Sequence, residues 1–237
     1  DDPMGTSTCV GCGECVQACP TGALMPSKEV GQVEPDKKVD SVCPYCGVGC
    51  LLTYNIKDDK ILFAEGRDGP ANMSRLCVKG RYGFNYVNSD QRLTVPLARK
   101  KGVSKDINPE EFDLNKIENY FEPISWDEAI KRTTEKFKSL VMDDSRSTAG
   151  FGCAKGSNEE AYLFQKLVRT GFRNNNVDHC TRLCHASSVV ALLEMIGSGA
   201  VSNQVADVAE AETIIVIGAN PTVNHPVAAT FIKNAAK

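Results

Sequence analysis

The sequence lacks any long uninterrupted apolar run. Its most apolar stretch, Val189 to Ile196, is short and includes Glu194, whereas a helix that spans a bilayer needs about 20 mostly apolar residues. A secretory signal is not visible at the N-terminus either. We therefore expect no transmembrane segment, and a soluble protein or the soluble part of one.

The chain also lacks a large excess of either charge. It has 237 residues, of which 27 are basic and 30 acidic, so its formal net charge is only −3. Binding to nucleic acid or to an anionic membrane usually requires a basic surface, and we expect neither as a partner. Because 42% of the residues are hydrophobic, the chain can bury the core of one large domain or of several small ones.

Cysteine, by contrast, is abundant. The chain has 11 cysteines, an odd number, and most of them fall into two groups with the spacing of metal ligands. Disulfide frameworks are typical of small secreted chains with an even number of cysteines. The pattern therefore favours metal-bound thiolates in a reducing compartment, and we expect a cytoplasmic protein.

The first group lies in "CVGCGECVQACP", which contains Cys9, Cys12, Cys15 and Cys19 and ends with Pro20. This spacing is the bacterial ferredoxin run that binds a [4Fe–4S] cluster. A zinc knuckle or a run of buried thiols is the alternative. Zinc sites, however, favour paired CxxC units that are well separated in sequence.

This ferredoxin run occurs once in the sequence. In two-cluster ferredoxins the fourth cysteine ligates the other cluster, and a second run supplies the reciprocal ligand. Cys19 therefore either closes a single local cluster or serves a cluster whose partner run lies upstream. We favour the second interpretation, and so expect that Asp1 is not the true start of the protein.

The second group combines Cys43, Cys46 and Cys50 in "VCPYCGVGC" with the distant Cys77. Between them, apolar residues alternate on both sides of an Asp-Asp pair, which predicts a β-hairpin. Three close thiolates and a fourth beyond the hairpin suit a second [4Fe–4S] cluster. A zinc ribbon is the alternative, but it would need a second CxxC where Cys77 stands alone.

Together with "EGRDGPAN" and "LCVKGR", these motifs resemble the N-terminal cluster domain of the molybdenum or tungsten bis(pyranopterin guanine dinucleotide) oxidoreductases. Within that family, an upstream ferredoxin-like module is similar to formate dehydrogenases with additional clusters and to the large subunit of complex I. The resemblance implies two or more [4Fe–4S] clusters and bis-molybdopterin guanine dinucleotide with molybdenum or tungsten. It also implies that Lys79 conducts electrons between cluster and pterin, whereas a lysine in a polar loop is otherwise simply solvated.

The expected fold class is α/β with small iron–sulfur domains. The expected parts are a ferredoxin-type module (1–38), a small β-rich [4Fe–4S] domain (39–98), a charged surface linker (99–123) and the start of a doubly wound, Rossmann-like α/β molybdopterin-binding region (124–237). Capping boxes at Ser125 with Glu128, and at Ser157 with Glu160, predict two amphipathic helices in the last part. A short strand and a glycine-bearing turn precede the second helix.

That turn contains the first candidate cofactor-binding residues, Lys155, Gly156 and Asn158. Free backbone amides at the start of a helix can bind phosphate or other polar groups. An ordinary strand-to-helix turn is the alternative, since no P-loop or GxGxxG pattern is present. The resemblance implies that this turn approaches the pterin dinucleotide.

A second candidate turn follows the continuous apolar run Thr213–Ile217, which predicts a parallel strand covered on both faces. Ligands of open α/β sheets bind at the carboxyl ends of the strands. Gly218, Asn220 and Pro221 are therefore predicted to form part of the dinucleotide pocket, before a helix that begins at about Pro226. The resemblance assigns this turn to the guanine dinucleotide.

Cys184 and His185 stand at the start of a predicted helix that has an apolar face and ends at Gly197. The residues alone leave three interpretations open. They could be a small buried cysteine beside a surface histidine, a cysteine nucleophile with an adjacent base, or a metal-bound thiolate beside an acid–base group.

The segment "NNNVDHCTRLCHASSV" is similar to the part of formate dehydrogenases in which cysteine or selenocysteine binds molybdenum or tungsten, directly before histidine. The resemblance implies that Cys184 is the metal ligand, since a soft thiolate suits that role. It implies that His185 accepts the proton released from formate. Cys153 and Cys180 receive no role.

The implied activity is that of a formate dehydrogenase catalytic (alpha) subunit, which oxidises formate to carbon dioxide, a proton and two electrons, and in reverse reduces carbon dioxide. The expected partners are electron-accepting subunits of the diaphorase, hydrogenase or ferredoxin type. Two alternatives are a nitrate reductase of the same superfamily and a non-catalytic electron-transfer subunit similar to the large subunit of complex I.

Overall fold

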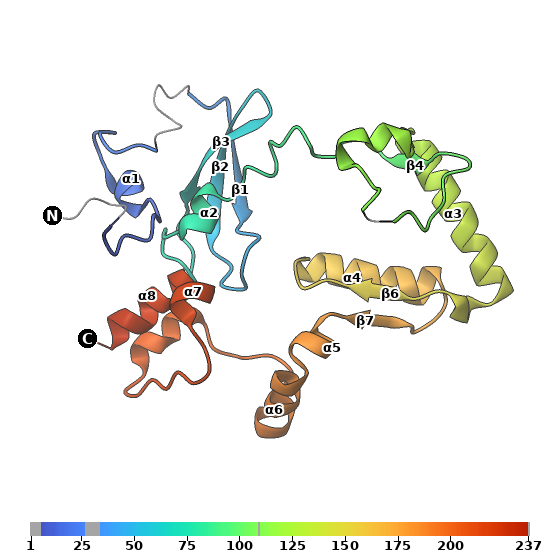
Figure 1. The fold of residues 1–237 in the computed structure, drawn as a ribbon. Helices are drawn as coiled ribbons and strands as arrows, with labels where there is room; N and C mark the ends of the chain where they lie inside the picture. The colour runs from blue at the N-terminus through green and yellow to red at the C-terminus, as the bar shows by residue number, and fades with distance from the viewer. Residues whose placement is uncertain (1–5, 27–33, 109, 237) are drawn as a thin grey trace. The chain divides into compact units, whose positions relative to one another are not determined.

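A computed structural model describes residues 6–26, 34–108 and 110–236 of the chain (Figure 1). The chain forms two compact units, one made of Asp1–Arg92 with Ala200–Lys237 and the other of Leu93–Gly199. Helices and strands occur in both units, so the mixed α/β class expected from the sequence is confirmed. In the described residues no helix is both long and apolar enough to cross a membrane.

The first unit is built around a small antiparallel sheet. Its elements are α1 (Glu14–Ala18), β1 (Lys37–Val42), β2 (Leu51–Lys57), β3 (Lys60–Gly66), α2 (Val78–Tyr82), the 3-10 helix η5 (Val205–Glu210), α7 (Pro221–Asn224) and α8 (Pro226–Ala235). The strand order is β1-β2-β3, and Figure 1 shows the three strands side by side.

The predicted hairpin is confirmed as β2 and β3, joined by Asp58 and Asp59. Both turn residues have positive φ, 48° and 58°, as a type I′ turn requires, and this turn matches the natural twist of the paired strands. The register pairs Lys57 with Lys60 next to the turn. The third strand, β1, was not predicted from the sequence.

The core of this unit lies at the cysteine-bearing end of the sheet. Buried side chains from three parts of the chain meet there: Val48, Cys50, Leu52, Leu76, Val227 and Phe231. The last two come from α8, which begins at Pro226 as predicted. The guanidinium of Arg75 also lies 5.6 Å from the centre of the Phe231 ring. Helix α8 is therefore part of the packing that supports the second cysteine group.

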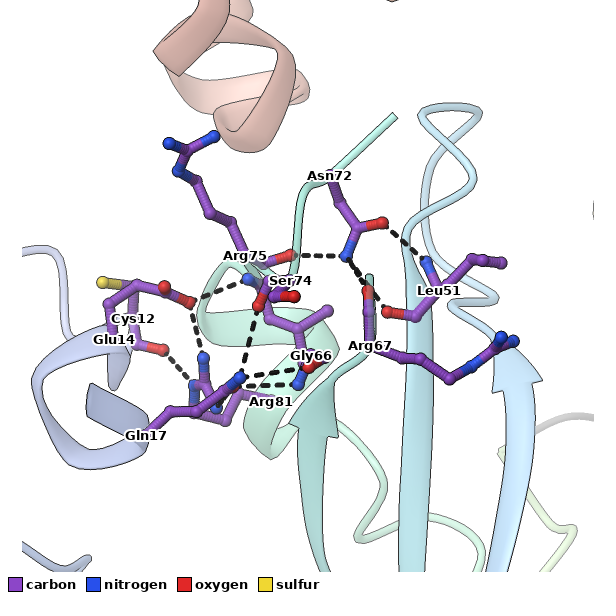
Figure 2. Close-up of polar contacts among 11 residues, drawn as sticks. Cys12, Glu14, Gln17, Leu51, Gly66, Arg67, Asn72, Ser74, Arg75 and Arg81 are labelled. Carbon is purple, nitrogen blue, oxygen red and sulfur yellow. Dashed lines mark hydrogen bonds and ion pairs between the residues drawn. The ribbon is translucent and has the colours of Figure 1, made fainter. Parts of the chain in front are cut away.

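Asn72 holds the chain between β3 and α2 against the start of β2. Its side chain is fully buried. The side-chain oxygen accepts a hydrogen bond from Leu51 N (3.1 Å), and the side-chain nitrogen donates to the carbonyls of Leu51, Arg67 and Arg75 at 3.0–3.1 Å (Figure 2). One side chain thus makes hydrogen bonds to four backbone groups of three residues.

We expect Asn72→Ala to lower the free energy of unfolding of this domain by about 3 kcal/mol, because it removes four hydrogen bonds made by a fully buried side chain. Urea unfolding measures the change. Asn85→Ala is the control, since Asn85 is exposed and surface substitutions usually change stability by less than about 0.5 kcal/mol. Equal midpoints for the two variants would contradict the assignment.

The second unit contains two small sheets and the longest helix. Its elements are β4 (Leu97–Arg99), η2 (Leu114–Asn119), β5 (Phe121–Pro123), α3 (Trp126–Asp143), η3 (Ser145–Ser147), β6 (Gly150–Gly152), α4 (Asn158–Lys166), the π-helical turn η4 (Leu167–Gly171), β7 (Val177–His179), α5 (Thr181–Cys184) and α6 (Ala186–Ile196). The segment expected as a surface linker contains η2 and β5, and β5 pairs with β4 in antiparallel register.

Strands β6 and β7 are parallel and are connected through α4, which makes a βαβ unit. The capping box of α4 is present in full, since the Ser157 hydroxyl accepts from Glu160 N (3.3 Å) and the Glu160 carboxylate accepts from Ser157 N (2.6 Å). At α3 only half of the predicted box forms. Ser125 accepts from Glu128 N, but the Glu128 carboxylate turns to Arg132 at 2.6 Å.

Two predictions about apolar segments fail in the structure. Residues 213–217, predicted as a buried parallel strand, form neither strand nor helix, and Ile215 and Ile217 are exposed. A strand needs a backbone partner, and none of the described strands pairs with this run. The predicted apolar face of α6 is exposed as well, because in the described residues α5 is the element that α6 chiefly contacts.

Candidate functional site

The second cysteine group gathers at one end of the β1-β2-β3 sheet. Cys43 directly follows β1 and Cys50 directly precedes β2, and Cys43 N donates to Cys50 O at 2.9 Å, which closes the loop that carries Cys46. Cys77 is the N-cap of α2. All four side chains belong to, or pack against, the same hydrophobic cluster.

The other three cysteines of the group affect the ionisation of Cys50. Burial raises the pKa of Cys50 to about 12, and the neighbouring charges of the other three cysteines of the group act in the same direction. Four thiolates this close repel one another unless cations neutralise them, and coordination to a metal deprotonates a thiol outright. The donor set therefore fits a metal cluster held by thiolates.

The first cysteine group is more open. Cys9 and Cys15 are exposed, whereas Cys12 and Cys19 are partly buried around α1. The pKa of Cys19 is lowered to about 7, chiefly by the hydroxyl of Thr21, whose oxygen lies 3.5 Å from the sulfur, and then by the amide of Leu24. A thiol with a lowered pKa forms the thiolate that iron binds more readily.

Within the described residues, no group of three or more His, Cys, Asp or Glu side chains is arranged to hold a metal ion. None of the 11 cysteines, all of which lie in described segments, is in a disulfide. In a [4Fe–4S] cluster each thiolate binds a different iron atom, so the ligands of a cluster need not converge on one ion.

Lys79, the residue expected to conduct electrons, lies in α2 and is exposed. It lines a small, mainly apolar pocket of about 260 Å³ together with Cys12, Cys77 and residues of α7 and α8. One cysteine of each group therefore faces the same pocket.

A pocket of about 710 Å³ in the second unit lies where β6 and β7 end and α4 begins. It is lined by Phe151, Gly152, Cys153, Lys155, Gly156, Glu160, Ala161, Phe164, Gln165, Val177, Asp178 and His179. The carboxyl ends of parallel strands are where α/β sheets bind ligands. Two of the three candidates in the first turn, Lys155 and Gly156, line this pocket, and Asn158 begins the helix beside it.

Sequence reasoning missed Asp178 and His179 in this pocket, because it did not predict the short strand β7. The ring nitrogen Nδ1 of His179 lies 2.6 Å from the Thr181 hydroxyl oxygen and accepts from Thr181 N at 3.2 Å. The pKa of Asp178 is lowered, first by the amide of His179 and further by Arg182, with which it forms an ion pair. The residues "VDH", which follow a run of three asparagines, are the signal that could have revealed them.

Cys184 and His185 lie at a break between two helices rather than at the head of one. Cys184 is the last residue of α5 and His185 is the N-cap of α6, with φ −131° and ψ 22°. The sequence predicts that both residues head the second helix, but this backbone conformation ends α5 at Cys184, and α6 begins at Ala186, after both of them. Both side chains are exposed, and Gly197 ends α6 with φ 71°, as predicted.

The second candidate turn lies in the first compact unit, whereas Lys155, Gly156, Asn158 and Cys184 lie in the other. Gly218 has φ 65°. Asn220 is the N-cap and Pro221 the first residue of α7, a position that proline favours. The three residues thus form a tight turn into a short helix, although no strand leads into it.

Three known families match consecutive parts of the chain. Residues 5–25 match the 4Fe-4S binding domain, residues 36–89 the molybdopterin oxidoreductase Fe4S4 domain, and residues 92–237 molybdopterin oxidoreductase itself. The cofactor types expected from the sequence, [4Fe–4S] clusters and molybdopterin, are confirmed by these matches.

Several curated proteins are similar to the chain. The F420-dependent formate dehydrogenase 2 subunit alpha of Methanococcus maripaludis is 38% identical over 200 residues, which cover 84% of this chain and 27% of that protein. A Staphylococcus haemolyticus protein whose name also contains formate dehydrogenase is 33% identical over an alignment that covers all of this chain and 27% of the relative. The chain thus spans about a quarter of the length of these relatives. The match to molybdopterin oxidoreductase covers more than half of the residues, and it shows that this chain belongs to the molybdopterin oxidoreductase family.

Proposed function

We propose that this chain is the N-terminal part of a formate dehydrogenase catalytic subunit. The observation that carries the proposal is the pair Cys184-His185, which follows a strand-end pocket in a chain similar to proteins named formate dehydrogenase. Formate oxidation yields carbon dioxide, one proton and two electrons, so a site for it needs a two-electron acceptor, a proton acceptor and a path for single electrons.

Cys184 would bind the metal that accepts the electrons, and His185 would accept the proton. The thiolate of Cys184 is a soft ligand that suits molybdenum or tungsten, and when bound that metal with its pterins supplies the two-electron acceptor. The imidazole of His185 is a general base of the kind that can accept this proton. Both side chains are exposed at the α5–α6 break, so neither is committed to packing in the described structure.

The pocket at the ends of β6 and β7 would hold part of a pterin guanine dinucleotide. Its position at the start of α4 supplies backbone amides, and Lys155 supplies a positive charge for phosphate. We propose the same role for the turn that contains Gly218, Asn220 and Pro221, at the start of α7. We also propose that β6, α4 and β7 belong to the doubly wound, Rossmann-like region that the sequence predicts.

We expect Lys155→Glu to reduce the molybdenum or tungsten content of the purified protein about tenfold, because a carboxylate would repel the phosphates that the lysine attracts. Mass spectrometry of the metals measures the loss. Lys166→Glu is the matched control, since Lys166 ends helix α4, which Lys155 precedes, lies over the Tyr162 ring at 5.8 Å and is outside the pocket lining. Equal metal contents for the two variants would contradict the assignment of the pocket.

The electrons would leave through the cluster of Cys43, Cys46, Cys50 and Cys77, with Lys79 beside it, and then through the cluster of the first cysteine group. A partner subunit of the diaphorase, hydrogenase or ferredoxin type would receive them. With a strong reductant the same path would run towards carbon dioxide reduction. We also propose a cytoplasmic location, on the basis of the cysteine pattern.

The complete protein that contains this chain tests the proposal through formate-dependent reduction of a viologen dye. We expect dye reduction with formate, and no oxidation of reduced dye with nitrate. Nitrate turnover without formate turnover would favour a nitrate reductase. Failure of both substrates, in a protein that has its iron but neither molybdenum nor tungsten, would leave a non-catalytic electron-transfer subunit.

A further inference from the structure

Arg81 is a buried cation that reaches away from its own helix. It lies in α2, four residues after Cys77, and is only 4% exposed. All three nitrogens of its guanidinium donate to the segment that carries the first cysteine group (Figure 2). Nε donates to the carbonyl of Cys12 (2.7 Å), Nη1 to the side-chain oxygen of Gln17 (2.7 Å) and Nη2 to the carboxylate of Glu14 (2.5 Å).

Glu14 and Gln17 in turn contact the small β-rich domain (39–98) that contains Arg81. The Glu14 carboxylate also accepts from Leu76 N at 2.8 Å. The Gln17 side chain pairs with the end of β3, where it accepts from Gly66 N (2.9 Å) and donates to Gly66 O (3.0 Å). We call Glu14, Gln17 and Arg81 the latch, because their side chains join two segments more than 45 residues apart in sequence.

The latch depends on charge compensation and on close approach. A buried guanidinium is costly unless it is paired and fully hydrogen-bonded, and the Glu14 carboxylate supplies the opposite charge. Gly13 lies directly against the latch with φ 74°. A Cβ atom there would lie 2.4 Å from Arg81 Cδ and 2.3 Å from the hydroxyl oxygen of Tyr82. Only glycine allows both this backbone conformation and this contact.

The latch forms hydrogen bonds with backbone groups at or next to an expected cluster ligand in each cysteine group. Its acceptor in the first group is the carbonyl of Cys12 itself. Its contact in the second group is the amide of Leu76, the residue before Cys77. Cys12 and Cys77 also line one pocket of about 260 Å³. The latch therefore fixes the two ligand-bearing segments relative to each other.

We propose that Arg81 is a positioning residue for electron transfer between the two [4Fe–4S] clusters. By holding the Cys12–Gln17 segment against the start of α2, it keeps the distance between the clusters constant. In each transfer one cluster loses an electron and the other gains it, with no bond or proton changed. This role depends on the two clusters but not on formate as the substrate.

The test uses the complete anaerobically purified protein with Arg81→Gln. In the wild type we expect the reduced clusters to show a magnetic interaction in electron paramagnetic resonance spectra, because such coupling falls steeply with distance. In the variant we expect an unchanged iron content, a weaker interaction, and about tenfold faster hydrogen exchange of the Gly66 and Leu76 amides, whose acceptors the latch supplies.

Two further variants make the result decisive. Gln17→Ala weakens the latch from the segment of the first cysteine group and leaves the β-rich domain (39–98) unchanged in sequence. If Arg81→Gln loses iron, Gln17→Ala should still show the weaker magnetic interaction and the faster amide exchange. Arg67→Gln removes the same charge from the same domain, but Arg67 forms only a half-exposed ion pair with Asp40 (3.6 Å) and should behave as wild type. Wild-type exchange and magnetic interaction in Gln17→Ala, or no interaction in the wild type, would overturn the proposal.

Discussion

Cys184→Ser is expected to reduce formate-dependent dye reduction to below about 0.1% of the wild-type rate, because the variant loses the proposed thiolate ligand of the metal that accepts the electrons. The iron content should stay unchanged, since Cys184 lies in the compact unit that does not contain the two cysteine groups. Steady-state assays with a viologen dye and iron analysis of the same sample measure both quantities.

Cys180→Ser is the matched control for this prediction. Cys180 is the N-cap of the same short helix, one turn before Cys184, and is also exposed. The same chemical change there should leave the rate within a few-fold of wild type. If the two variants lost activity equally, the assignment of Cys184 as the ligand would be wrong.

The second large effect is expected from Cys50→Ser. Cys50 is the buried member of its group and part of the core with Leu52 and Leu76. Serine there replaces a thiolate ligand with a hydroxyl in an apolar setting, which favours neither iron binding nor packing. We expect the iron content to fall by about four atoms per chain, the number in one [4Fe–4S] cluster, and formate-dependent dye reduction to fall with it.

Cys153→Ser is the control, because it shows whether the loss of any one thiol lowers the iron content. Cys153 is exposed in the other compact unit, in the lining of the strand-end pocket. Its replacement should leave the iron content at the wild-type value. An iron content in Cys50→Ser equal to that of Cys153→Ser would refute the second cluster site.

Features encoded within a few residues were predictable from the sequence. The Asp58-Asp59 turn, the capping box of Ser157 with Glu160 and the helix end at Gly197 all depend on local backbone preference, and all three are present. The cofactor types were predictable because the spacing of the cysteines reflects the geometry of cluster binding. Local patterns therefore identified both the small iron–sulfur domains and the family.

Features that depend on distant partners were missed or wrong. Strand β7 has three residues and is defined by its pairing with β6 rather than by its own pattern. The apolar run Thr213–Ile217 has the composition of a strand but no strand partner in the described structure. Arg81 looks like an ordinary basic residue in "LCVKGR", and only its partners at Cys12, Glu14 and Gln17 reveal its position.

The central claim is that this chain belongs to a molybdenum- or tungsten-dependent formate dehydrogenase with clusters at both cysteine groups. The most direct measurement is mass spectrometry of iron, molybdenum, tungsten and zinc in the complete native protein. We predict molybdenum or tungsten near one atom per chain and iron at about four atoms per cluster motif, with little zinc. Zinc in place of iron, or iron with neither molybdenum nor tungsten, would contradict it.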